Sequence, residues 1–332
     1  MITRFILQRA LSAIPVLLIV SLLMFAIFQL MPGTYCDEPL SGQRQAICNE
    51  LRERFGLSDP FYVQYARWVQ NILLKGDFGP SLAPPFQPAF VAIAGEGRFV
   101  NSVLIAALTL LFALCVSVPT ALYSAIRPYS PGERIFSFLS VLGLSIPSFL
   151  MGVVLLELLV DWFQVGRRWG LLVTGLPDLG TAFASLGHFG DFLWRLWPIV
   201  LIAGTWQTAE AYRQMRGVLL EICADPVWRG QLRQARTTSE HCALYAQAVG
   251  NAFAALASWF GLWLPLIFEG TMIAGIVLSV PVMEFALWTA VRREDVYVAL
   301  AGLVIFSSLL IAANLIVDLL WIVGSQSRIR YD

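Results

Sequence analysis

Residues Asp225–Gly250 read DPVWRGQLRQARTTSEHCALYAQAVG and form an extended polar, arginine-bearing run between two apolar stretches. Arg229, Arg233 and Arg236 recur at spacings of four and three, so on a continuous helix they would share one face. A polar helix that connects two membrane spans cannot bury itself in lipid. It is therefore either a solvated loop or a segment that docks on a soluble partner, and the rest of the chain bears on that choice.

The composition is typical of a membrane protein. Of the 332 residues, 58% are hydrophobic and 13% are charged, and the mean hydropathy is +0.71, whereas a soluble domain carries about 25% charged residues. The formal net charge is zero, so the balance indicates no nucleic-acid partner. The first apolar run lacks a small-residue cleavage site, so we expect it to be a retained span and not a removed signal.

The sequence predicts neither a metal centre nor a nucleotide site. His188 and His241 stand apart from any Cys/His cluster with metal-ligand spacing. There is no Gly-rich loop followed by Lys-Ser/Thr, so we expect no ATP binding of the Walker type in this chain. No catalytic set emerges either, and we expect the chain not to be an enzyme.

Six stretches have the roughly 20 mostly apolar residues that a transmembrane helix needs. They are Phe5–Met31, Val100–Ile126, Ile135–Phe163, Leu193–Arg213, Phe253–Val277 and Val298–Val323. These runs are too long for barrel strands, so we predict an all-α, polytopic membrane protein with one transmembrane domain over residues 1–332. The fourth run is the weakest, because Arg195 and Glu210 bracket its short apolar centre. Pro147 and Pro265 lie inside apolar runs, where we expect them to kink or break a helix.

The distribution of arginine in short connecting segments predicts the orientation, because cytoplasmic segments carry the excess of positive charge. Eleven arginines fall on one side, at positions 4, 9, 127, 134, 213, 216, 229, 233, 236, 328 and 330. Five fall on the other, at positions 167, 168, 195, 292 and 293. We therefore expect both termini and the loop over residues 214–250 to be cytoplasmic.

The first hydrophilic segment, Pro32–Arg98, is too long to be a simple linker and predicts a small cap on the outer surface. A helix is expected at Phe61–Leu74, where Phe61, Tyr65, Trp68 and Ile72 fall on one face. Gly76 to Pro80 is a turn signal, and the following Pro-rich residues are expected to be irregular. Cys36 and Cys48 lie in this segment and would form a disulfide if it faces an oxidising compartment; two free thiols are the alternative.

Two carboxylates in or near the last two spans, Glu269 and Asp318, are costly in lipid and are often functional there. A proton relay would need a chain of titratable partners, and none is visible in the sequence. An acid satisfied at a helix junction is the simpler interpretation.

Several segments together resemble one family. The opening FILQRALSAIPVLLIVSLLMFAIFQLMPG from Phe5 is similar to the basic start, Pro-bearing first span and closing Pro-Gly of permease subunits of bacterial peptide-type ABC importers, the dipeptide/oligopeptide/nickel group. FGLSDPFYVQYARWVQNILLKGDFGPSL from Phe55, SIPSFLMGVVLLELL from Ser145 and NLIVDLLWIVGSQSRIR from Asn314 also resemble that family. The outer insertion after the first span is similar to the first of its two permease types, and the matches span nearly the whole chain.

The resemblance implies that the arginine-bearing loop is the coupling helix that fits a groove of a separate ATPase subunit. It points to Arg229, Arg233, Ala235 and Arg236 for that contact. The chain departs from the family pattern here, because Thr237 stands in an alanine position and Ser239 stands where a glycine is expected.

The same resemblance implies the partners and the place of work. They are a second permease, two ATPase subunits that hold ATP and Mg²⁺, a periplasmic solute-binding protein and the lipid bilayer of a bacterial inner membrane. Peptides are the expected solute, while similar permeases also carry nickel chelates, opines, glutathione or oligosaccharides. The alternatives are a stand-alone secondary transporter or channel, which would be expected to show inverted repeats or clustered ion ligands, and a structural scaffold.

Overall fold

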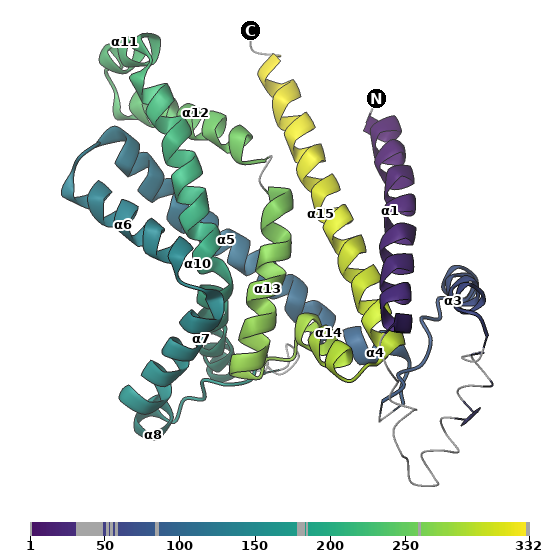
Figure 1. Cartoon of the computed structure of the whole chain (residues 1–332). Helices are drawn as coiled ribbons and strands as arrows, with labels where there is room; N and C mark the ends of the chain where they lie inside the picture. The colour runs from purple at the N-terminus through teal and green to yellow at the C-terminus, as the bar shows by residue number, and fades with distance from the viewer. Residues whose placement is uncertain are drawn as a thin grey trace. The chain divides into compact units, whose positions relative to one another are not determined.

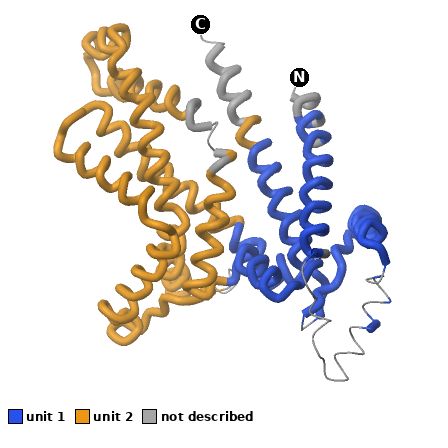
Figure 2. The backbone as a smooth tube through the Cα atoms, in the orientation of Figure 1, with its two compact units in different colours: residues 1–102, 281–315 blue, residues 103–280, 316–332 orange. Residues whose placement is uncertain are grey.

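A computed structural model describes residues 2–30, 49–50, 53, 56, 59–83, 86–177, 183, 185–257 and 260–329. Within these ranges the regular elements are helices, apart from an isolated bridge between Pro80 and Pro88 (Figure 1). The predicted all-α class is therefore confirmed. The chain divides into two compact units, residues 1–102 with 281–315 and residues 103–280 with 316–332 (Figure 2).

The first unit brings residues 1–102 and 281–315 together around one apolar cluster. Its helices are α1 (Ile2–Leu30), α3 (Phe61–Lys75), α4 (Ala89–Ala94), the start of α5 (Arg98–Ile126), α14 (Met283–Arg292) and the first part of α15 (Val296–Ile329). The cluster includes Phe25, Trp68, Ile93, Met283 and Leu300. Residues far apart in the sequence thus share one core.

Helix α3 packs against α1 through aromatic side chains. The rings of Phe25 and Tyr65 lie 5.7 Å apart, and those of Phe25 and Trp68 lie 6.5 Å apart. The Trp68 indole N–H donates to the carbonyl of Phe78 at 2.9 Å. Gly76 ends α3 in the left-handed conformation, with φ of 65°. The helix and turn predicted here are confirmed, although Phe61 is exposed and does not join the buried face.

The second unit is built on one long helix. Helix α10 (Leu186–Ala224) contacts α6 (Pro131–Ser145), α7 (Ser148–Glu157), α12 (Thr238–Ala257) and α13 (Phe260–Leu278). The unit also holds the π-helical turn η1 (Leu158–Trp162), α8 (Val165–Trp169) and α11 (Pro226–Gln234). Its core cluster includes Ala121, Ala211, Met215, Leu219 and Trp263.

Small residues allow α13 to approach α10 closely. A Cβ atom added at Gly270 would lie 2.7 Å from the Cα atom of Ala203 on α10, which is closer than real Cβ contacts come. No side chain larger than hydrogen fits there without a backbone shift. This contact fixes the separation of the two helices.

Among the described residues, three segments are long and apolar enough to cross a membrane: Leu11–Phe28, Arg98–Ile126 and Val296–Leu319. Two helix pairs qualify if each is counted as one broken span, namely Pro131–Ser145 with Ser148–Trp162 and Trp263–Leu278 with Met283–Arg292. The chain is therefore a multi-pass membrane protein. The stretch Leu193–Arg213 lies inside α10 but is not among these segments, so the number six stays a prediction.

The third predicted span is not one straight helix. Helix α6 ends at Ser145, α7 begins at Ser148, and the two segments meet at 103°. Pro147 explains the break, because a proline restricts the residue before it to extended conformations, and Ile146 has φ of −84° and ψ of 117°. The break predicted at Pro147 is confirmed. Pro265, by contrast, lies inside α13 without ending it.

We predict that Gly270→Ala destabilises the second unit by about 1–3 kcal/mol, because the new methyl group overlaps the Ala203 backbone. Thermal unfolding in detergent measures the effect. Gly217→Ala is the matched control: Gly217 lies in α10 with open space around its Cβ position, and a helical alanine there is neutral or stabilising by up to about 1 kcal/mol. Equal unfolding temperatures for Gly270→Ala and the native chain would contradict the close contact.

Candidate functional site

Helix α11 is a short, separately capped helix between α10 and α12. The Asp225 carboxylate accepts a hydrogen bond from the Val227 N–H at 2.8 Å, and Pro226 occupies the first helical position. Both features favour a new helix start. The polar stretch therefore begins a second helix at Asp225 and does not continue α10.

The arginines of this region are exposed. Arg229 and Arg233 lie on α11, which contains no buried residue. The Arg229 Nε donates to the carbonyl of Cys223 at 2.9 Å. Within the described part of the chain, no carboxylate forms an ion pair with Arg229, Arg233 or Arg236. Three guanidinium groups thus face outward from this end of the second unit.

The spacing of the three arginines predicted one shared helical face, and the structure shows that they do not share one. Helix α11 ends at Gln234, and Ala235 is extended, with φ of −61° and ψ of 122°. Ala235 is half-buried, and Arg236 lies beyond the helix in the turn to α12. The prediction of a shared face was wrong because the chain is not helical at Ala235 and the next helix has its own start signal at Thr237.

That start signal is a capping box. The Thr237 hydroxyl accepts from the Glu240 N–H at 3.2 Å, and the Glu240 carboxylate accepts from the N–H groups of Arg236 and Thr237 at 2.6 and 3.3 Å. Such reciprocal bonds satisfy donors that a helix start leaves unpaired. The two backbone hydrogen bonds to its carboxylate hold the pKa of Glu240 below its ordinary value. The bond from Arg236 has the larger effect, and the bond from Thr237 comes second. The threonine in the expected alanine position is therefore a helix cap.

One aromatic side chain attaches α11 to the second unit. The ring of Trp228 lies 5.9 Å from that of Tyr245 on α12. Trp228 also packs, together with Cys223, against the core cluster around Met215 and Leu219. A helix with an exposed polar face is thus joined to the core by a single large apolar contact.

A polar network joins α6, α5 and α10 below this region. Glu133 is 7% exposed, and its carboxylate accepts from Arg216 and from the Ser137 hydroxyl, both at 2.8 Å. The Tyr212 hydroxyl lies 3.1 Å from that of Ser137 and donates to Ser124 at 3.0 Å. Sequence reasoning missed this network, although Ser130 and Glu133 carry a readable helix-start signal: the Ser130 hydroxyl accepts from the Glu133 N–H.

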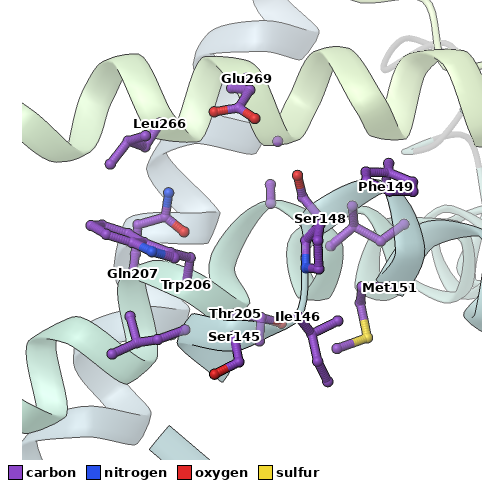
Figure 3. Close-up of a pocket in the computed structure, with 15 residues that line it drawn as sticks. Ser145, Ile146, Ser148, Phe149, Met151, Thr205, Trp206, Gln207, Leu266 and Glu269 are labelled. Atoms are coloured by element: carbon purple, nitrogen blue, oxygen red, sulfur yellow. The ribbon is translucent and has the colours of Figure 1, made fainter. Parts of the chain in front are cut away.

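A pocket of about 400 Å³ lies at the α6–α7 break, between that break, α10 and α13 (Figure 3). It is lined by Leu144, Ser145, Ile146, Pro147, Ser148, Phe149, Met151, Ile202, Ala203, Thr205, Trp206, Gln207, Leu266, Glu269 and Gly270. The sequence favoured an acid at a helix junction, but Glu269 lies within α13. Its side chain is exposed and turns toward the pocket.

Two cysteines and two histidines are also candidate site residues from the sequence. Cys36 and Cys48 lie outside the described residues, so their pairing stays a prediction. His188 and His241 each contact a helix-start group, the Ser185 hydroxyl and the Thr237 carbonyl respectively. No group of three or more His, Cys, Asp or Glu side chains that could hold a metal ion occurs in the described ranges.

Comparison with known proteins places this arrangement in a family. Residues 1–115 match the model of the N-terminal part of binding-protein-dependent transport system membrane components, and residues 117–321 match the model of the binding-protein-dependent transport system inner membrane component. The chain belongs to this family of ABC transporter permeases. The resemblance inferred from the motifs is confirmed.

Individual permeases match over nearly their whole length. The oligopeptide transport system permease protein AppB of Bacillus subtilis is 29% identical over 98% of this chain and 99% of its own length. The dipeptide transport system permease protein DppB of Escherichia coli is 26% identical over 99% of both chains. The glutathione transport system permease protein GsiC of Salmonella paratyphi A is 25% identical over 98% of this chain and 99% of its own.

For this permease, we predict that Arg216→Met lowers the free energy of unfolding by about 1.5 kcal/mol, because Glu133 loses a charged hydrogen-bond donor. This loss is at the low end of the range for hydrogen bonds to charged groups, because the Arg216 side chain is 31% exposed to solvent. Arg213→Met is the control: Arg213 is exposed on the same helix and no ion pair involves it within the described ranges. Thermal unfolding in detergent separates the two, and equal losses would contradict the pair's role.

The capping box predicts that the stability of the start of α12 depends on pH. Because the folded-state pKa of Glu240 lies below its ordinary value near 4.5, its stabilisation is present above that value and is lost as pH falls through the depressed pKa. We expect the amides of Arg236 and Thr237 to lose protection from hydrogen exchange below about pH 4.5. Glu240→Gln should lack this acid-dependent step. The same step in both proteins would contradict the assignment.

Proposed function

We propose that this permease is the membrane subunit of an ATP-driven importer of peptides. The names of its full-length relatives, oligopeptide, dipeptide and glutathione permeases, support that solute class. We propose a second permease, two ATPase subunits carrying ATP and Mg²⁺, and a periplasmic solute-binding protein as its partners. This chain would then supply the path through the inner membrane while hydrolysis occurs on separate subunits.

The structure and exposure of α11 support the proposal most directly. It is a short helix without buried residues, it presents Arg229 and Arg233 outward, and it is attached to the core through Trp228. A coupling helix must be exposed enough to enter a groove on another subunit and attached firmly enough to move its own unit. We propose Arg229, Arg233, Ala235 and Arg236 as the contact with the ATPase.

ATP binding and hydrolysis can drive transport through this permease only if the contact between α11 and the ATPase subunits differs between their ATP-bound and ATP-free states. A ligand shifts a conformational equilibrium by no more than its difference in affinity for the two states. The ATPase dimer, closed by ATP or open without it, acts as such a ligand on α11. The firm attachment of Trp228 would convert that difference into a movement of α10 and α12.

The proposed orientation follows from the arginine count: six membrane spans, with both termini and the coupling loop in the cytoplasm and the cap over residues 32–98 in the periplasm. In this orientation α11 faces the compartment that contains ATP. The orientation is necessary to the mechanism, because an ATPase cannot reach an external helix.

The test is Arg233→Glu in the full transporter, assembled with its partner subunits. We expect ATP-dependent uptake of peptide to fall at least tenfold, because reversed charge repels the groove that receives the helix. The amount of chain inserted in the membrane should not change. Arg134→Glu is the matched control, since Arg134 is an exposed arginine on the same proposed side but in the first turn of α6.

Two results would reject the proposal. One is uptake by Arg233→Glu at the native rate. The other is labelling of a cysteine introduced at position 233 by an impermeant reagent added outside intact cells, which would place α11 on the wrong side of the bilayer.

A further inference from the structure

The pocket of the second unit lies at the break between α6 and α7. Pro147 cannot donate a backbone hydrogen bond, and the first helical bond of α7 is donated by Met151 to the Pro147 carbonyl. No side chain caps the start of α7. The N–H groups of the first α7 turn therefore lack helical partners and adjoin the pocket. Broken helices with free backbone groups mark solute sites in many transporters.

A single carboxylate faces this opening from the other side. Glu269 is the one ionisable residue in α13, whose sequence is FGLWLPLIFEGTMIAGIVL. Within the described ranges, no ion pair or hydrogen bond involves its side chain. A carboxylate in an apolar helix costs free energy, and such residues pair with a partner or face a polar path. In Figure 3 it turns toward the space occupied by Trp206, Gln207 and Ser148.

The neighbouring polar side chain does not supply the missing partner. Gln207 is 1% exposed, and with its amide in the satisfied orientation its nitrogen donates to the Ala203 carbonyl at 2.6 Å and its oxygen accepts from the Ile267 N–H at 3.2 Å. Ser145 donates its hydroxyl to the Val141 carbonyl at 2.7 Å. Gln207 and Ser145 are thus satisfied by backbone groups, and the Glu269 carboxylate has no described partner in the protein.

The rest of the lining is apolar or weakly polar. Leu144, Phe149, Met151, Trp206 and Leu266 contribute large side chains without formal charge. Such walls accept varied apolar groups and fix no particular side chain, whereas one carboxylate selects a cation. A volume of about 400 Å³ lies within the range of small-molecule sites.

We propose that this pocket binds the α-ammonium group of a peptide through the carboxylate of Glu269, with the first residues of the peptide beside the α6–α7 break. The proposal rests on the proposed peptide function and adds a binding site to it. The ammonium group is common to all peptides with a free N-terminus, so a site built on it accepts many sequences. The side chains of the peptide would contact the apolar wall.

The pocket is tested by protection from labelling in the full transporter with its partner subunits. Ser148→Cys is introduced after the native cysteines are replaced, and its reaction with uncharged N-ethylmaleimide is timed. Tri-alanine should slow the reaction at least fivefold, and N-acetyl-tri-alanine should not, because it has no ammonium group. Adding Glu269→Gln should remove the protection, and Glu269→Asp should keep part of it.

Uptake measurements complete the test. Glu269→Gln should lower uptake of a di- and tripeptide pool at least tenfold. Glu157→Gln is the matched control and should transport normally, because Glu157 is an exposed carboxylate on α7 outside the pocket. Equal labelling of Glu269→Gln and native protein without peptide shows that the fold is kept.

The outcomes separate the two proposals. Absence of protection by tri-alanine, equal protection by the acetylated peptide, or protection that survives Glu269→Gln overturns the ammonium site. Failure of the native transporter to take up any peptide in the pool overturns the peptide function instead, and the labelling result then still decides whether the pocket binds ammonium groups.

Discussion

Helix α10 runs from Leu186 to Ala224 without a break, and the second unit depends on its contact with α13. The contact is possible because Gly270 lets the backbones meet at Ala203. The same helix forms one wall of the pocket at Ile202–Gln207 and leads directly into the Asp225 cap of α11. Gln207 and Ala224 are about 25 Å apart along such a helix. One continuous helix therefore connects the pocket to the segment that carries the exposed arginines.

The polar groups of this unit are distributed according to what each location can satisfy. Near the α11 end, the buried carboxylate of Glu133 has Arg216 and Ser137 as donors. The bond from Arg216 joins α6 to α10. Glu269 is different, because it is the one ionisable residue of its helix and no ion pair or hydrogen bond of its side chain occurs within the described ranges. The first arrangement joins α6 to α10, and the second leaves a carboxylate without a described partner at the pocket.

The first unit shows a related use of a carboxylate. Asp295 is 3% exposed just before α15, and it accepts hydrogen bonds from the Ser81 hydroxyl and from the N–H groups of Leu82 and Ala83. Residues more than 200 positions apart are thereby joined. The segment around Ser81 is consequently attached to the start of α15, and Leu82 lies in the same apolar cluster as Leu300.

The sequence by itself determined the helical class, the membrane setting and the family, because long apolar runs and local motifs are properties of contiguous residues. It also located the break at Pro147 and the turn at Gly76, since proline and glycine act on their own backbone. It misjudged the face shared by Arg229, Arg233 and Arg236, because a capping box at Thr237 competes with helix continuation and decides the boundary. Only the tertiary structure brought Glu269, Trp206 and Ser148 around one pocket, and Glu133 to Arg216, because those contacts join helices whose relative placement is set by packing at positions such as Gly270 and not by any local pattern.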